Sequence, residues 1–280
     1  MNTPSQEFFR EVAGARGRAI VDRFGGAVRS IYRRSSRRRT LFEHVGTCTF
    51  LRIDSIPLLV TAAHVIDVGK ADGSLWIAAQ KTIVPLQGSF TGTESPQGHR
   101  SVDRYDFAVS AVTDRFLDKL EDVTFIDSEF VCKDRRSASE RALYICLGYP
   151  NSKNNDMHVG RREMSSQLCT HSAAGHMDPD KIGKASSRYH EANLFVELDK
   201  QVFDAEGAKT GPVSVRGMSG GPVFCIGELG DYDSLRQKHE FRARLEGIII
   251  EKPRDANVIV AITTSVIVQT VRRHRLFGLT

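Results

Sequence analysis

Short apolar and β-branched stretches recur along most of this chain, and no other sequence feature constrains its fold as strongly. From about residue 41 onward, Gly, Asp, Ser and Pro separate these stretches, and such residues end strands and form turns. We interpret the following runs as strands: 44–53, 56–66, 74–80, 81–88, 105–112, 141–150, 163–173, 193–200, 221–227, 243–252 and 256–266. Ten or more short strands with few helices between them favour barrels or a sandwich over a β-α-β sheet. The predicted fold class is therefore all-β.

The two ends of the chain show helical patterns instead. Across residues 4–32, apolar residues recur every three or four positions among arginines. Residues 265–277 predict a closing helix with a basic last turn. We therefore expect three parts. Residues 1–40 form a basic helical N-terminal extension, residues 41–135 form a first β unit, and residues 136–280 form a second β unit that includes the C-terminal helix. Three polar segments are predicted to be long loops: 151–162, 174–192 and 228–242.

Positive charge is concentrated in the N-terminal extension. Residues 1–40 hold ten arginines and three acids, a net charge of +7, whereas the whole chain carries +5, so residues 41–280 carry −2. The run RRSSRRR at 33–39 could contact nucleic acid or an anionic membrane surface. A solvated basic linker is the favoured interpretation of the arginine run, because charge runs are usually solvated.

The expected cellular location follows from what the sequence lacks. No apolar run reaches the length of about 18 residues that a membrane-spanning helix needs. The N-terminus has no apolar segment after a basic start, so a secretory signal is not expected. Five scattered cysteines argue against a disulfide framework. These features predict a cytoplasmic protein.

The run RGMSGGPVFC, residues 216–225, places Ser219 among glycines and raises two interpretations: a nucleophile on a tight turn, or an ordinary glycine-rich loop. The spacing Gly217-x-Ser219-x-Gly221 also matches the nucleophile elbow of α/β-hydrolases. That elbow requires a helix directly after the serine, whereas Pro222 and the residues after it predict a strand. It also requires its acid and histidine later in the chain, where only His239 and His274 remain among the histidines. The elbow is therefore disfavoured.

Better partners for Ser219 lie upstream. LVTAAHVI places His64 at the end of an apolar strand, and YDFAVSAV places Asp106 at the head of another. A carboxylate that enters a buried strand needs a partner, and a histidine N–H is suitable. Asp103 is a local rival, but the apolar run starts directly after Asp106. Serine, histidine and carboxylate are the groups that acyl transfer through a serine nucleophile requires.

These residues give the chain its resemblance to trypsin/chymotrypsin-like serine proteases. The segments TAAH (61–64), DFAV (106–109) and GMSGGP (217–222) follow the order of that family. The resemblance implies two six-stranded antiparallel β-barrels with a site between them. It implies that His64 is the general base, that Asp106 orients it and that Ser219 attacks the substrate carbonyl. The N–H groups of Gly217 and Ser219 would then bind the oxyanion.

The chain departs from secreted trypsins in ways that bear on regulation and specificity. Met218 stands where those enzymes carry the aspartate that pairs with a new N-terminus, so activation by cleavage is not expected, and the chain resembles HtrA-like bacterial proteases more. The base of the substrate pocket would be Val213, which predicts an apolar pocket unless Glu251 reaches it. Arg216 and Ile250 complete the expected pocket lining.

Cys169, His171 and His176 have spacing that could hold zinc, but a fourth ligand is not evident, so no metal or cofactor is expected. The sequence thus predicts a serine endopeptidase that acts on protein or peptide substrates, controlled by residues 1–40 or by a protein partner that they bind. The alternative is a catalytically silent binding or scaffold protein with the same fold, recruited through its basic arm.

Overall fold

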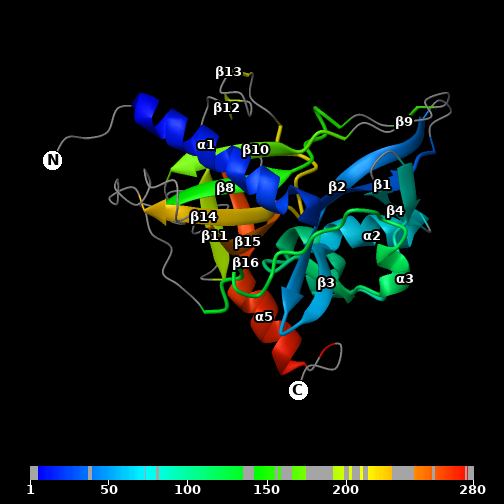
Figure 1. Cartoon of the computed structure of the whole chain (residues 1–280). Helices are drawn as coiled ribbons and strands as arrows, with labels where there is room; N and C mark the ends of the chain where they lie inside the picture. The colour runs from blue at the N-terminus through cyan, green and yellow to red at the C-terminus, as the bar shows by residue number, and fades with distance from the viewer. Residues whose placement is uncertain are drawn as a thin grey trace.

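The structure is a computed structural model. It describes the following residues: 6–36, 40–72, 74–79, 82–134, 142–154, 157–158, 166–174, 192–198, 202–203, 209–210, 214–228, 243–253, 256–274 and 276. Figure 1 shows two curled sheets that lie side by side, with one long helix near each end of the chain.

The first sheet is antiparallel and holds eight strands among the described residues, in the order β5-β4-β1-β2-β3-β7-β6, with β9 paired to β2. Its strands are β1 (Val28–Arg34), β2 (Thr40–Ile53), β3 (Ile56–Ala62), β4 (Leu75–Ala79), β5 (Thr82–Pro85), β6 (Thr91–Gly92), β7 (Phe107–Ala111) and β9 (Met157–His158). Since β6 and β9 have two residues each, six longer strands form the body of this sheet.

The second sheet is also antiparallel and has the order β10-β8-β14-β15-β16-β11. Its strands are β8 (Ala142–Gly148), β10 (Cys169–Ala174), β11 (Asn193–Glu197), β14 (Pro222–Glu228), β15 (Arg244–Glu251) and β16 (Val258–Thr263). A separate short hairpin joins β12 (Val202–Phe203) to β13 (Lys209–Thr210). The two curled antiparallel sheets confirm the predicted all-β, double-barrel fold class.

Helices occupy the ends and the connections. The longer helices are α1 (Gln6–Phe24), α2 (Ala63–Asp72) and α5 (Thr264–Arg273). Short turns of helix are η1 (Gly25–Ala27), η2 (Pro96–Gly98), η3 (Arg100–Val102) and α3 (Asp114–Leu117). The predicted C-terminal helix is confirmed as α5, and its last turn carries Arg272 and Arg273.

The helix expected over 4–32 is correct only as far as Phe24. Residues 28–34 form β1, which pairs with both β2 and β4, so the prediction of helix is wrong there. Helix α1 ends directly before Gly25, a single 3-10 turn follows at Gly25–Ala27, and pairing with distant strands then overrides the local apolar spacing. The strand expected over 56–66 is likewise shorter, because β3 ends at Ala62 and α2 begins at the next residue.

One continuous hydrophobic core joins the two sheets. It includes residues of α1, β2, β8, β15 and α5, such as Ile20, Phe50, Ile145, Ile248 and Val271. Phe24 at the end of α1 stacks on Phe224 of β14, with 4.8 Å between the ring centroids. This shared core fixes the two sheets relative to each other, and therefore fixes any site formed between them.

Candidate active site

His64 and Asp106 meet where the first sheet joins helix α2. The carboxylate oxygen Oδ2 of Asp106 lies 2.6 Å from Nδ1 of His64. Its other oxygen accepts a hydrogen bond of 2.9 Å from the backbone N–H of His64. The Asp106 carboxylate is buried, whereas the His64 side chain is 36% exposed. The buried carboxylate therefore holds the ring at Nδ1, and the rest of the ring is partly exposed to solvent.

The backbone at Asp106 has an unusual conformation that serves this contact. Its φ is +38°, in the left-handed region that residues other than glycine seldom adopt. Asp is among the few side chains that tolerate this region. The carbonyl of Asp106 accepts a 3.0 Å hydrogen bond from Ala63, directly before His64. Three hydrogen bonds thus tie Asp106 to the first turn of α2.

Asp103, the local rival, has a different set of partners. Its carboxylate accepts hydrogen bonds from Arg100, at 2.6 Å, and from the hydroxyl of Thr93, also at 2.6 Å. Nε of Arg100 also donates to the carboxylate of Asp67 on α2, at 2.8 Å. Arg100 therefore connects the helix that carries His64 to the segment that leads to Asp106. Its two carboxylate partners raise the pKa of Arg100 although partial burial opposes this.

Ser219 lies on the turn that precedes β14. The N–H of Met218 donates to the carbonyl of Val215 at 3.0 Å and closes a turn in which Gly217 has φ of +95°. Gly220 has the same φ, and its N–H donates to Ile249 at 2.7 Å. These two conformations require glycine. A strand and not a helix follows the serine, which confirms that this is not the α/β-hydrolase elbow.

Two backbone amides of this turn differ from their neighbours. The N–H groups of Arg216, Met218, Gly220 and Gly221 all donate hydrogen bonds. Within the part of the chain that the structure describes, the N–H groups of Gly217 and Ser219 have no acceptor. Unused amide donors beside a serine hydroxyl are the arrangement that an oxyanion site needs.

Threonines of β2 hold the serine turn against the first sheet. The hydroxyls of Thr47 and Thr49 donate to the carbonyls of Gly217 and Gly220, both at 2.8 Å. The N–H of Thr47 also donates to the carbonyl of Ser219 at 2.8 Å. A Cβ added at Gly220 would overlap the carbonyl oxygen of Thr47. The turn is thus fixed to the sheet whose strand β3 leads into the helix that carries His64, although about 170 residues separate the bonded groups.

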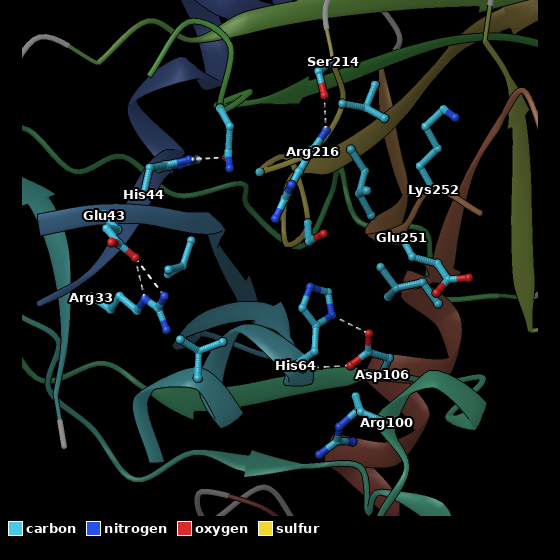
Figure 2. A pocket seen from close by; sticks show the side chains of 18 residues that line it. Arg33, Glu43, His44, His64, Arg100, Asp106, Ser214, Arg216, Glu251 and Lys252 are labelled. Carbon is cyan, nitrogen blue, oxygen red and sulfur yellow. Dashed lines mark hydrogen bonds and ion pairs between the residues drawn. The ribbon is translucent and has the colours of Figure 1, made fainter. Parts of the chain in front are cut away.

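A cleft of about 1110 Å³ brings these groups together. It is lined by His64, Asp106, Gly217 and Ser219, and by three residues expected in the substrate pocket: Arg216, Ile250 and Glu251. Figure 2 shows His64 and Asp106 on one side of the cleft, with Arg216 extending toward them from the opposite side. Val213 lies outside the described residues, so the predicted apolar pocket stays a prediction. The hydroxyl of Ser219 has no hydrogen-bond partner among the described residues.

Sequence reasoning missed several residues of this cleft. His44 and Asn151 hydrogen-bond at 2.7 Å, and a Cβ at Gly217 would overlap Oδ1 of Asn151. The N–H of Asn151 donates to the carbonyl of Arg216 at 2.7 Å. No local motif marks these residues. The contact partners Thr47 and Arg100 were equally unmarked, because their roles depend on segments far apart in the sequence.

Met218, Cys48 and Cys146 are buried in apolar surroundings. Met218 is 1% exposed and packs in a small cluster with Cys146 and Val223. All five cysteines are free thiols. Burial raises the pKa of Cys48 and of Cys146 to about 12, so neither is a thiolate nucleophile near neutral pH.

No metal centre is evident in the described residues. They contain no group of three or more potential ligands that could hold a metal ion. Cys169 and His171 lie on β10, whereas His176, the third residue of the candidate zinc cluster, lies outside the described residues.

Comparisons with known proteins find similarity in structure only. No family model matches the chain, and no curated protein matches its sequence. Among solved structures, the scabies mite inactivated protease paralogue SMIPP-S-D1 has 11% identity and a TM-score of 0.52, and the match covers 91% of this chain and 94% of that one. The chain has the fold of the trypsin-like serine proteases.

Two proteases match at lower TM-scores. The serine endoprotease from Yersinia pestis has 15% identity and a TM-score of 0.49, with 99% of this chain and 70% of that one covered. The HtrA-type protease AlgW has 14% identity and a TM-score of 0.48, with 94% of this chain and 64% of that one covered. At these identities the likeness concerns the fold alone, and function depends on the site itself. Among the described helices, none is long and apolar enough to cross a membrane.

Proposed function

We propose that the chain is a serine endopeptidase in which Ser219, His64 and Asp106 form a catalytic triad. The observation that carries the proposal is the pair of hydrogen bonds that Asp106 accepts from His64, in the cleft that Ser219 also lines. The unused N–H groups of Gly217 and Ser219 support it, because they supply an oxyanion site beside the hydroxyl.

The proposed reaction has two halves. The hydroxyl oxygen of Ser219 attacks the substrate carbonyl while Nε2 of His64 takes the hydroxyl proton. The N–H groups of Gly217 and Ser219 donate to the oxyanion of the tetrahedral intermediate. His64 then gives its proton to the leaving amine, and the C–N bond breaks. In the second half, His64 removes a proton from water, the hydroxide attacks the acyl ester, and Ser219 is released with its proton.

Asp106 contributes by fixing the ring of His64. Its Oδ2 accepts from Nδ1, so Nε2 is the nitrogen left to exchange protons with Ser219. The negative charge also stabilises the imidazolium that forms during both halves. No metal or cofactor is needed for this chemistry.

A fluorophosphonate probe tests the proposal, because such probes react with activated serine hydroxyls. We expect the wild-type chain to be labelled at Ser219, and the Ser219→Ala and His64→Ala variants to remain unlabelled. Ser128→Ala is the matched control, since Ser128 hydrogen-bonds Arg52 and does not line the cleft. Absence of labelling in a folded wild-type sample would refute the enzyme proposal.

The alternative is a silent binding protein with a protease fold. One observation favours it: among the described residues, the hydroxyl of Ser219 has no hydrogen bond to His64. In substrate-free proteases this bond is often long and tightens only when substrate binds, so the enzyme is the better proposal. A silent protein would bind peptides in the cleft equally well with Ser219 or Ala at this position.

Regulation by the N-terminal segment, or by a partner that it binds, also stays a proposal. Deletion of residues 1–40 cannot test it, because that deletion would remove β1 from the first sheet. Reversing the charge of exposed Arg23 on α1 is the better test, with labelling rate and partner binding as readouts. Contact of residues 33–39 with nucleic acid or membrane would appear instead as salt-sensitive binding. A cytoplasmic location is the expected setting, to be checked by fractionation.

A further inference from the structure

Most charged side chains around the cleft are already paired. Arg33 lies 2.8 Å from Glu43, and His64 lies 2.6 Å from Asp106. Nη2 of Arg100 lies 2.7 Å from the carboxylate of Asp67, and Arg100 also pairs with Asp103. Arg33 and Arg100 therefore already have carboxylate partners and are not free to bind an acidic ligand, while His64 is held by Asp106.

Arg216 differs from them. Its side chain is exposed and lines the cleft, and among the described residues its guanidinium has no ion pair or hydrogen bond. Its backbone is fixed on both sides: the N–H donates to the hydroxyl of Ser214 at 3.3 Å, and the carbonyl accepts from Asn151 at 2.7 Å. Figure 2 shows the side chain extending from this turn into the cleft, on the side that faces His64. A fixed turn thus presents an unneutralised cation inside the cleft.

The remaining charges at the cleft do not cancel Arg216. Lys252, also exposed and without an ion pair among the described residues, adds a second positive charge at the rim. Glu251 is the neighbouring acid, and in Figure 2 its carboxylate points away from Arg216. Among the described residues that line the cleft, Arg216 and Lys252 are therefore cations without an ion pair, and a substrate carboxylate could supply the partner that Arg216 lacks.

We infer that the substrate carries an Asp or Glu side chain close to the scissile bond, and that Arg216 binds it. This inference rests on the proposed function. Arg216 directly precedes Gly217, whose N–H is proposed to hold the scissile carbonyl. Its guanidinium therefore lies near the side chains that flank that carbonyl. A planar guanidinium can bind a carboxylate through two parallel hydrogen bonds, which are stronger than neutral ones.

Cleavage-site profiling on a mixed peptide library tests the inference. We expect wild-type chain to cleave peptides with Asp or Glu within two residues of the cleaved bond at least about tenfold faster than matched Asn or Gln peptides, equivalent to about 1.4 kcal/mol. Arg216→Gln should remove this preference, and Arg216→Glu should turn it toward Lys and Arg. The preference of the wild-type chain should weaken as salt is raised, because the site is open to solvent.

Arg273→Glu is the matched control. Arg273 is exposed in the last turn of α5 and does not line the cleft, so the variant has the same change in net charge as Arg216→Glu. It should retain the acidic preference. A preference that is lost in both variants would indicate a general charge effect and would overturn the role of Arg216.

Fluorophosphonate labelling separates failure of this inference from failure of the proposed function. If Ser219 is not labelled, the proposed function fails, and the inference fails with it. If Ser219 is labelled and the library is cleaved without acidic enrichment, the inference alone is overturned. The same holds if Arg216→Glu cleaves with an unchanged preference. If Ser219 is labelled but no peptide is cleaved, the endopeptidase proposal and the inference both fail.

Discussion

The two halves of the proposed site are built in different ways. On the first sheet, side chains fix His64: the Asp106 carboxylate accepts from its ring and its N–H, and Arg100 joins α2 to the segment before Asp106. On the second sheet, Ser219 is fixed through the backbone of its own turn. The turn depends on two glycines with φ of +95° and on hydrogen bonds between main-chain groups and β2.

The difference follows from what each half contributes to catalysis. A general base has to keep one ring orientation while its charge changes, and a buried carboxylate supplies both orientation and charge stabilisation. A nucleophile beside an oxyanion site needs free N–H groups, so side chains cannot fill that space. The first half should therefore be sensitive to loss of charge, and the second half to addition of atoms.

The largest effect is expected from Asp106→Asn. An amide keeps the size of the side chain but cannot hold the same His64 tautomer, because its NH2 group competes as a donor. We expect the rate of Ser219 labelling to fall by about 10⁴-fold. The matched variant Asp103→Asn changes the neighbouring acid that does not contact His64, and it should lower the rate far less. Equal losses would show that Asp106 has no special role.

A smaller loss is expected from Gly217→Ala. The new methyl group would overlap Oδ1 of Asn151 and would occupy a residue with φ of +95°, so the turn must move. Displacement of one oxyanion donor lowers catalysis by about 10²- to 10³-fold. Gly98→Ala is the control, because Gly98 has φ of +76° but no atom within 4 Å of the added carbon. Similar losses of labelling in both variants would mean that the cause is general destabilisation, which thermal unfolding would reveal.

The smallest of the three effects is expected from Arg100→Gln. This change removes the link between Asp67 and Asp103 and leaves the 3% exposed carboxylate of Asp103 without its cation. We expect a loss of about 1–3 kcal/mol in the free energy of unfolding, and a modest drop in labelling rate.

The exposed pair of Arg52 and Asp127 supplies the comparison for Arg100. Arg52→Gln breaks a salt bridge of 2.8 Å between side chains that are 42% and 53% exposed, so it should cost less than about 1 kcal/mol. If Arg100 positions His64, Arg100→Gln should also change the pH dependence of the labelling rate. Arg100→Lys should then restore part of the rate and bring its pH dependence back toward that of wild type. If the labelling rate per folded molecule is unchanged in Arg100→Gln, Arg100 has a structural role only.

Much of this molecule could be predicted from local sequence patterns. The alternation of apolar residues with Gly, Pro and Asp indicated most of the longer strands of both sheets, but not β1. The glycines around Ser219 indicated a turn, since only glycine adopts a φ of +95° without strain. Pro222 and the run after it correctly predicted a strand after the serine. These features depend on the conformational preferences of neighbouring residues, which a sequence displays directly.

Only the tertiary structure decided the rest. Val28–Arg34 has a helical apolar spacing but pairs with two strands, because the hydrogen bonds and burial gained there exceed a weak local preference. His64 lies in the first turn of a helix, Arg100 bonds a residue 33 positions away, and Thr47 holds a turn 170 residues downstream. Arg216 became a candidate for binding acidic residues once its neighbours in the cleft proved to be paired. Contacts across such distances have no local signal, so only the folded chain reveals them.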